Sequence, residues 1–332
     1  MKLLLFFTLL LTVSVAVFAQ QWPVMPPALK PGDTIAIISP SSAPDKATVR
    51  KGCEVLRQWG YVPVVGQHAL CQYHGFAGMA DERVSDFLWA LRNPAVRAVM
   101  CSRGGDGAVQ VLQRVALDEF SSHPKWIVGF SDVTALHSAA VSAGVMSIHA
   151  SMCDGIAATG ERRDSVNGIM RQLLQGVLPT YVAPPHTLNQ HGVAEGMLVG
   201  GNMSVFCGLA GSDYDFLNRA DEGLILFIED TAESISKVDR MLHLLEIRGI
   251  LAELKGVIVG HFSKYKCPEN DFADMYDMLH EYLQHYAIPV CYDFPVGHHS
   301  SYNYPMVEGC RVRLTVDGQG TQVRFLSENN QL

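Results

Sequence analysis

The sequence lacks the cysteine spacings that are typical of zinc sites. Its eight cysteines are scattered, with no C-x-x-C pair and no zinc-finger spacing, so no metal site is expected from them. A chain of this length does not need disulfides to stabilise its core, and we expect no obligatory disulfide framework. Cys101 and Cys207 lie in apolar runs and are expected to be buried as small hydrophobic residues.

Positive charge is also scarce. The chain has 25 Lys and Arg against 33 Asp and Glu, a net charge of −8, which gives no electrostatic basis for binding nucleic acid or anionic membranes. It contains no apolar run of the ~20 residues that a membrane anchor requires. No internal repeat or low-complexity tract stands out.

The first residues are typical of a secretory signal peptide. Lys2 precedes a short apolar segment, residues 3–18, and small residues stand before an expected cleavage site after Ala19. No cysteine follows this site, so a lipoprotein is not indicated. The chain without residues 1–19 has 24 basic and 33 acidic residues, a net charge of −9. We expect an exported protein, periplasmic or secreted.

The remaining 313 or so residues are enough for two domains. In residues 20–177, apolar strands without a polar face alternate with helices. This pattern predicts a doubly wound α/β domain with a mostly parallel sheet. The expected strands are 34–38, 61–65, 96–100, 125–128 and 147–150, and the expected helices are 47–59, 81–91, one from 108, and 133–143.

The second half of the chain has a different pattern. Residues 178–193 are rich in Pro, Thr, Asn, Gln and His and are predicted to be a linker. Residues 194–332 are expected to form a mixed α/β domain with antiparallel strands, including a hairpin around 317–320. The expected strands are 223–228, 256–259, 289–294, 311–316 and 321–325, and the expected helices are 234–247 and 271–286.

A serine stands where a strand is expected to turn into a helix. Gly129-Phe130-Ser131-Asp132 follows the apolar residues 125–128 and precedes a helical stretch from Val133. A serine on such a turn projects its hydroxyl outward beside backbone N–H groups, as a nucleophile requires. The same residues are also ordinary helix-capping residues, so the turn alone leaves both interpretations open.

Other strands also end in reactive residues. Ligands and catalytic groups in open α/β sheets collect at the carboxyl ends of strands, and Glu229 and His298 lie at such positions. In the order Ser131, Glu229, His298 they would supply a nucleophile, an orienting acid and a general base. Their separation in sequence does not establish that the three side chains meet.

Five ordered motifs resemble those of the L,D-carboxypeptidases of the S66 serine peptidase family, which includes murein tetrapeptide carboxypeptidase and the microcin C immunity peptidase. The resemblance extends from Leu29 to about Leu314. The motifs are Arg103-Gly104-Gly105-x-Gly107, Gly129-Phe130-Ser131-Asp132-Val133-Thr134-Ala135, Gly200-Gly201-Asn202, Ile228-Glu229-Asp230-x-x-Glu233 and Gly297-His298.

The resemblance implies a Ser131, Glu229 and His298 triad at a site between the two domains. It also implies a homodimer, no metal or other cofactor, and removal of the terminal D-alanine from a peptidoglycan tetrapeptide at its diaminopimelate. With the signal peptide, it suggests a periplasmic L,D-carboxypeptidase whose partner is a peptidoglycan-derived peptide.

Backbone donors are needed to stabilise the tetrahedral intermediate of such a reaction. The N–H groups of Asp132 and Gly105 are the candidates, and losing one donor typically costs ~3 kcal/mol of transition-state stabilisation. Arg103, Gly104 and Asn202 are candidates for substrate binding. Arg103 is equally compatible with a structural ion pair, and Asn202 with turn formation.

Several neighbouring residues have simpler interpretations. Glu233 is expected to form a helix capping box with Asp230. His299 is the main rival of His298 for the role of base. His137 and His243 lie in helical patterns and are expected to be packing or surface residues.

Some positions depart from the family pattern and leave the substrate open. They are Asp106, Ala150 and Ser151 in His149-Ala150-Ser151-Met152, Asp213-Tyr214-Asp215, and Lys237. Two alternatives therefore stay open: a related serine peptidase or amidase acting on another small peptide or a peptide-nucleotide antibiotic, and a catalytically silent peptidoglycan-binding protein.

Overall fold

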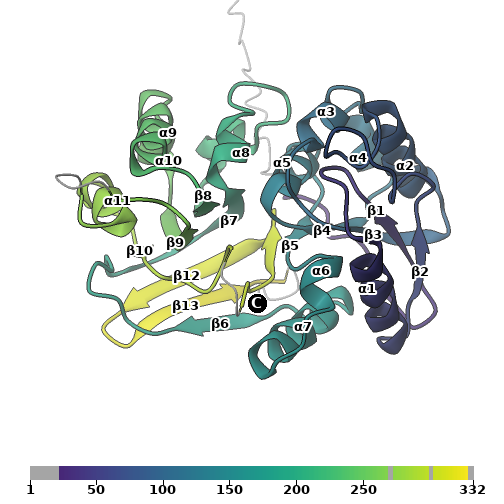
Figure 1. The fold of residues 1–332 in the computed structure, drawn as a ribbon. Helices are drawn as coiled ribbons and strands as arrows, with labels where there is room; N and C mark the ends of the chain where they lie inside the picture. Colours follow the sequence, from purple (N-terminus) through teal and green to yellow (C-terminus); the bar gives the residue numbers. More distant parts are fainter. Residues whose placement is uncertain (1–21, 268–271, 299–301, 328–332) are drawn as a thin grey trace, which may run out of the picture.

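A computed structural model describes residues 22–267, 272–298 and 302–327. The expected signal peptide and His299 lie outside these residues. Two sheets lie side by side, each with helices packed against it (Figure 1). The predicted fold class, a doubly wound domain joined to a mixed α/β domain, is confirmed.

The N-terminal sheet has the strand order β11-β5-β4-β3-β1-β2. All its neighbouring strands are parallel except β11, which pairs antiparallel with β5. The strands are β1 (Thr34–Ile38), β2 (Val62–Val65), β3 (Val96–Cys101), β4 (Trp126–Gly129), β5 (Ser147–His149) and β11 (Met306–Glu308). The helices of this half are α1 (Lys46–Gln58), α2 (Ala80–Arg92), α3 (Ala108–Leu112), α4 (Asp118–Ser122), η1 (Ser131–Val133), α5 (Thr134–Ser142), α6 (Cys153–Ile156) and α7 (Glu161–Leu174).

The apolar pattern accounts for this half of the molecule. Every residue of β4 is buried, as expected for a parallel strand covered on both faces. Helix α1 begins where the Asp45 side chain accepts a hydrogen bond from the Thr48 N–H, and it buries Val49, Cys53 and Leu56 at helical spacing. The predicted elements therefore agree with the observed ones to within a few residues.

The C-terminal sheet has the strand order β10-β9-β8-β7-β12-β13-β6. Strands β7 to β10 are parallel, and β12, β13 and β6 continue the sheet in antiparallel pairing. The strands are β6 (Thr180–Ala183), β7 (Gly192–Asn202), β8 (Leu224–Thr231), β9 (Gly256–Ser263), β10 (Val290–Cys291), β12 (Arg311–Asp317) and β13 (Gly320–Phe325). The helices are α8 (Met203–Cys207), η2 (Phe216–Glu222), α9 (Ile235–Ile247), α10 (Ile250–Glu253) and α11 (Met275–Leu283).

Three strands were not predicted. The segment 178–193, expected to be a linker, contains β6 and the first two residues of β7. Strand β7 has four glycines, which hide its strand character, yet its last seven residues are buried between β8 and β12. The third, β11, comes from the C-terminal part of the chain and completes the N-terminal sheet.

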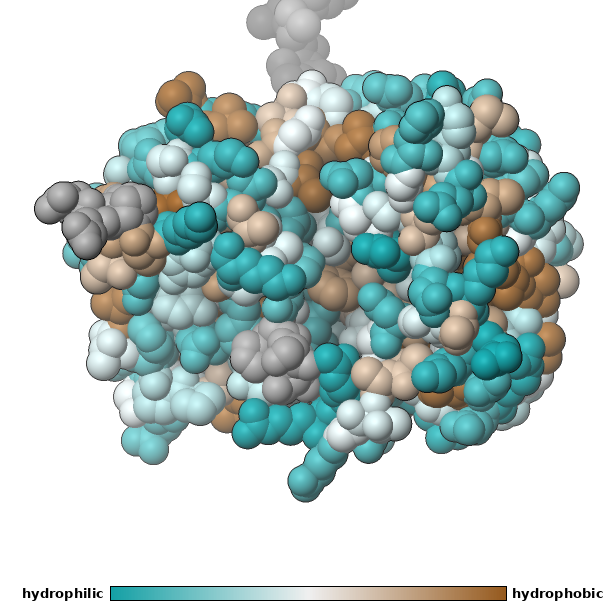
Figure 2. Space-filling model, in the orientation of Figure 1, coloured by the Kyte–Doolittle hydropathy of each residue, from teal (hydrophilic) through white to brown (hydrophobic). Residues whose placement is uncertain are grey.

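Buried residues of both halves form a continuous hydrophobic cluster between the sheets. Cys101 and Cys207 are buried, as predicted, and all eight cysteines are unpaired. In Figure 2 hydrophobic side chains appear at the right edge, where Figure 1 places β2; Val62, Val64 and Val65 of this edge strand are exposed. Within the described ranges, no helix is long and apolar enough to span a membrane.

Candidate active site

Ser131 occupies a sharp turn between β4 and η1. Its φ of 65° lies in the left-handed region, which non-glycine residues rarely adopt and which is common at functional turns. Gly129 permits the turn, because a Cβ there would lie 2.8 Å from Val133 Cγ1. The strand, strained serine and following helix form the geometry expected of a nucleophile.

Glu229 and His298 come from the C-terminal sheet. Glu229 is fully buried near the end of β8, and His298 follows the loop after β10. Gly297 has a φ of 114°, and a Cβ on it would lie 2.7 Å from Glu229 Cβ. Only glycine therefore brings the His298 backbone so close to Glu229.

The three predicted residues form one hydrogen-bonded chain. Ser131 Oγ lies 2.9 Å from His298 Nε2, and His298 Nδ1 lies 2.5 Å from Glu229 Oε2. A carboxylate only accepts hydrogen bonds, so Nδ1 carries the proton and Nε2 is left to accept from the Ser131 hydroxyl. The chain joins the two halves of the molecule.

The surroundings of His298 favour its protonated form. Burial opposes the charge, but the Glu229 carboxylate outweighs it through its charge and hydrogen bond, so the pKa of His298 lies above its ordinary value. The Phe130 ring packs 5.0 Å from the imidazole, centroid to centroid. His298 is therefore held on one side by an aromatic ring and on the other by an acid.

Two buried residues that the sequence did not single out as site residues support the histidine turn. Asn303 Oδ1 accepts a hydrogen bond from Gly297 N at 2.8 Å and lies 3.3 Å from His149 Nε2. Burial lowers the pKa of His149 well below its ordinary value, so it is neutral. The link from β5 to the Gly297 turn is visible only in three dimensions, because Asn303 and His149 are far apart in sequence.

The first of the two glycines after Arg103 lies against Ser131. A Cβ on Gly104 would lie 2.8 Å from Ser131 Cβ, so this backbone passes directly beside the serine. Gly105 has a φ of 114° and is packed against Ser42. The turn thus passes beside Ser131 at Gly104, and the donor role predicted for the Gly105 N–H stays a prediction.

The Asp132 side chain points away from Ser131. Its carboxylate accepts hydrogen bonds from Ser41 Oγ at 2.6 Å and from Ala108 N at 2.8 Å. Because Ala108 is the first residue of α3, Asp132 caps α3 and not the helix that follows Ser131. Burial raises the pKa of Asp132. The Asp132 carboxylate is thus engaged by Ser41 and Ala108, and the role predicted for its backbone N–H stays a prediction.

The other two candidates for substrate binding differ. Arg103 is exposed; its guanidinium lies 3.4 Å from the Ala43 carbonyl and forms no ion pair with any residue that the structure describes. Asn202 is buried, and its amide caps α8 and donates to Asp230 Oδ1 at 3.0 Å. Turn formation therefore accounts for Asn202 completely, whereas Arg103 keeps its cationic group in solvent.

The capping box predicted for Glu233 and Asp230 is wrong. Helix α9 begins after Ser234, and Glu233 pairs with Lys237 at 2.8 Å. Asp230 instead accepts from the Ser204 N–H at 2.7 Å, which holds the start of α8. Asp230 lies near the end of β8, where Asn202 at the end of β7 and Ser204 at the start of α8 donate to its carboxylate in place of α9.

The predictions for His137 and His243 are confirmed. His137 is buried and lies 2.9 Å from the Gly129 carbonyl, and burial lowers its pKa to about 4. His243 lies on α9, partly exposed, 2.9 Å from Glu246 Oε2. His137 is therefore a buried residue that supports the end of β4 through its contact with the Gly129 carbonyl.

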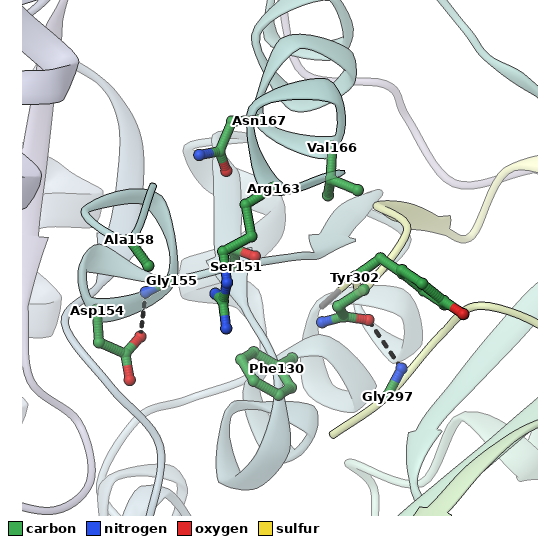
Figure 3. A pocket seen from close by; sticks show the side chains of 11 residues that line it. Phe130, Ser151, Asp154, Gly155, Ala158, Arg163, Val166, Asn167, Gly297 and Tyr302 are labelled. Atoms are coloured by element: carbon green, nitrogen blue, oxygen red, sulfur yellow. Dashed lines mark hydrogen bonds between the residues drawn. The ribbon is translucent and has the colours of Figure 1, made fainter. Parts of the chain in front are cut away.

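A cavity of about 230 Å³ opens beside this chain of residues. Phe130 and Gly297, the neighbours of Ser131 and His298, form part of its wall (Figure 3). Ser151, one of the departures from the family pattern, also lines it. We call it the charged cavity; its lining residues are Phe130, Ser151, Asp154, Gly155, Ala158, Arg163, Val166, Asn167, Gly297, Tyr302 and Asn303.

The other departures have local structural roles or lie at the surface. Tyr214 donates to the Leu112 carbonyl at 2.8 Å, and Asp215 pairs with Arg248 at 2.7 Å. Asp106 and Asp213 are exposed. In the described part of the chain, no group of three or more His, Cys, Asp or Glu is arranged to hold a metal ion.

Known proteins resemble this chain in sequence and fold. The family model described as LD-carboxypeptidase N-terminal domain matches residues 35–150, and the LD-carboxypeptidase C-terminal domain matches residues 195–314. A protein of Synechocystis sp. is 33% identical over 91% of this chain and 97% of its own length. The Bacillus subtilis protein named "Probable murein peptide carboxypeptidase" is 31% identical over 82% of this chain and 86% of its own. The crystal structure of muramoyltetrapeptide carboxypeptidase from Oxalobacter formigenes superposes with a TM-score of 0.78 and 26% identity, over 89% of this chain and 99% of that one.

Proposed function

Because the chain belongs to the LD-carboxypeptidase family, we propose that it is a serine carboxypeptidase that removes the terminal D-alanine from peptidoglycan tetrapeptide stems. The observation that carries the serine mechanism is the hydrogen-bonded chain from Ser131 through His298 to Glu229. The substrate is proposed from the named relatives, one a murein peptide carboxypeptidase and one a muramoyltetrapeptide carboxypeptidase.

Acylation begins with Ser131. As its oxygen attacks the carbonyl carbon of the scissile amide, the hydroxyl proton passes to His298 Nε2, and Glu229 stabilises the imidazolium that forms. The N–H groups of Asp132 and Gly105 stabilise the oxyanion. His298 then protonates the departing amine of D-alanine, the C–N bond breaks, and the tripeptide remains as an ester of Ser131.

Deacylation uses the same groups in reverse. With the leaving amine gone, a water molecule attacks the ester while His298 Nε2 accepts its proton. His298 then returns a proton to the Ser131 oxygen as the ester bond breaks, and the tripeptide leaves with a free carboxylate. Arg103, whose guanidinium is exposed, is proposed to attract the terminal carboxylate of the incoming peptide.

The test is incubation of the purified protein with murein tetrapeptide and detection of tripeptide and D-alanine by mass spectrometry. The wild type should release D-alanine, and Ser131→Ala should lose at least ~10³-fold in kcat because the nucleophile is gone. Ser121→Ala, on the exposed helix α4, is the matched control and should keep full activity.

Two outcomes would contradict the proposal. If the folded wild type releases no D-alanine, the substrate is wrong. If Ser131→Ala keeps wild-type activity, the serine mechanism is wrong.

We also propose that the protein is exported and dimeric. The charged and apolar pattern of residues 1–19 supports export, and the family resemblance supports the dimer. Expression in a Gram-negative host should yield a periplasmic protein whose N-terminus, measured by mass spectrometry, is Gln20. Light scattering should give twice the chain mass. Recovery of an uncleaved chain from the cytoplasm would refute export.

A further inference from the structure

Ser131 and His298 belong to different halves of the molecule. Ser131 follows β4 of the N-terminal sheet, whereas the loop that carries His298 follows β10 of the C-terminal sheet. The distance between Ser131 Oγ and His298 Nε2 therefore depends on how the two sheets are held relative to each other. Because a displacement of about 1 Å at a reacting group can lower a rate by about 10²-fold, a direct link between the base and the sheet that carries the nucleophile favours the reaction.

One side chain links the loop of the proposed base to β5, the strand next to β4. Asn303 Oδ1 accepts a hydrogen bond from the Gly297 N–H at 2.8 Å, the bond drawn at Gly297 in Figure 3. The same oxygen lies 3.3 Å from His149 Nε2. His149 is the last residue of β5 and is in register with Gly129 at the end of β4, two residues before Ser131. The nucleophile and the link to the base thus lie at the same level of adjacent strands.

The His149 side chain is held in one place. Its ring is fully buried and packs 5.7 Å from the Phe130 ring and 5.2 Å from the Phe227 ring, centroid to centroid. Burial lowers the pKa of His149 well below its ordinary value, so the imidazole is neutral and carries one N–H. Because Asn303 Oδ1 is an acceptor, that hydrogen is assigned to Nε2. His149 is therefore a fixed donor that orients the Asn303 amide.

The C-terminal half holds the other side of the same turn. The His261 N–H at the end of β9 donates to the Val296 carbonyl at 2.9 Å, and the Glu229 side chain packs against Gly297. These contacts fix the turn relative to its own sheet, and Asn303 adds a contact with the other sheet. The turn before His298 is thus held from both halves of the molecule.

We propose that Asn303, oriented by His149, is a positioning residue that holds His298 at hydrogen-bonding distance from Ser131. The kinetic test of this inference rests on the proposed function, whereas its structural test does not. Without the link the turn is held mainly by the C-terminal sheet, and the distance from Nε2 to Oγ increases. Since His149 does not line the charged cavity, its loss should lower kcat and leave KM almost unchanged.

The first test is the steady-state kinetics of two His149 variants with murein tetrapeptide. His149→Phe keeps a ring between Phe130 and Phe227 but removes the donor, and kcat should fall by about 10- to 100-fold with KM within about twofold of the wild type. His149→Gln places an amide N–H near the position of Nε2 and should keep kcat within about threefold. His243→Phe, the same substitution on α9, is the matched control and should keep full activity.

A variant of Asn303 tests the link from its other end. Asn303→Ala removes the acceptor and should also lower kcat. Because His149 acts through Asn303, the variant with both substitutions should lose no more activity than Asn303→Ala alone, whereas two independent effects would multiply. Urea denaturation of each variant should give a cooperative transition, which shows that the losses do not come from unfolding.

A crystal structure of the His149→Phe protein tests the inference without any substrate. The distance from Ser131 Oγ to His298 Nε2, which is 2.9 Å in the wild type, should exceed about 3.5 Å. If His149→Phe does not fold, the same distance is measured in Asn303→Ala. A longer distance supports the inference even if the wild type does not hydrolyse the tetrapeptide, a result that would refute the proposed function alone. An unchanged distance, equal losses of kcat in His149→Phe and His149→Gln, or losses that multiply in the double variant would overturn the inference.

Discussion

At the scale of single residues, His298 lies between a hydroxyl and a carboxylate. In the proposed mechanism it accepts a proton from Ser131, which it does only when it is neutral. Because Glu229 raises the pKa of His298 above its ordinary value of ~6.5, a larger part of the protein carries a protonated His298 at mildly acidic pH, a form that the proposed mechanism cannot use. In that mechanism Glu229 both orients the imidazole and sets the pH range of the reaction.

We expect kcat/KM to rise with pH through an apparent pKa above ~6.5. In Glu229→Gln this limb should move to lower pH, because the carboxylate that favours the imidazolium is gone, and kcat should fall by about 10²- to 10⁴-fold. The measurement is kcat/KM for the tetrapeptide between pH 5 and 9.

Glu233→Gln is the matched control, since Glu233 pairs with Lys237 and not with a histidine. Its pH profile should equal that of the wild type. A Glu229→Gln profile with an unchanged acidic limb would show that another group controls it.

At the scale of elements, glycines allow the turns to approach one another. Gly104 brings its turn against Ser131, and Gly297 brings the His298 loop against Glu229. At Gly297 two requirements coincide, a φ of 114° and no room for a Cβ. The positions of the reactive groups thus depend on loop backbones as much as on the strands.

Gly297→Ala should lower kcat/KM by at least ~10-fold, because the new Cβ displaces His298 relative to Ser131. Its positive φ should also cost about 1–3 kcal/mol of unfolding free energy. Gly168→Ala is the control: Gly168 lies within α7 with nothing within 4 Å of an added Cβ, and alanine there should stabilise by about 0.5–1 kcal/mol. Kinetics and urea denaturation measure both effects, and full activity of Gly297→Ala would refute the packing argument.

At the scale of the whole molecule, β11 joins the two halves. The chain passes from the histidine loop into the N-terminal sheet, where β11 pairs with β5, and it then returns to the C-terminal sheet as β12. Glu308 at the end of β11 is fully buried, and burial raises its pKa well above the ordinary value. β11 therefore buries the ionisable Glu308 side chain where the two halves of the molecule join, and the candidate active site also combines residues of both halves.

Glu308 should make the protein less stable as the pH rises. The unfolded chain releases this proton near pH ~4.3, whereas the folded chain retains it to higher pH, so the folded state is favoured less with every pH unit above ~4.3. Glu308→Gln removes this cost and should raise the unfolding free energy at pH 8 by about 1–3 kcal/mol, with a smaller gain at pH 5. Urea denaturation at both values measures it.

Glu54→Gln, on the exposed face of α1, is the control and should leave the pH dependence unchanged. A Glu308→Gln protein that is less stable than the wild type at pH 8 would contradict the expectation.

Most strands of the N-terminal half and its helices α1, α2, α3 and α5 were predictable because apolar strands and amphipathic helices are local patterns, whereas α4, α6 and α7 were not predicted. The C-terminal half was less so. Glycines obscure β7, and β6 and β11 are short strands that form only because distant strands offer them an edge. The prediction of the capping box was wrong because it also depended on distant strands. Pairing of β7 with β8 brings the start of α8 near Asp230, and the Ser204 N–H donates to its carboxylate.

The sequence by itself determined the doubly wound N-terminal domain and the glycine-serine turn, and it singled out Ser131, Glu229 and His298 as candidates, because periodicity and short motifs are local properties of the chain. Only the tertiary structure decided that these three meet at hydrogen-bonding distance, that Asn303 and His149 support the histidine turn, and that Asp154 and Arg163 share a cavity. These contacts join residues whose separation along the chain carries no information about distance. They exist because β11 and the packed sheets bring the two halves together.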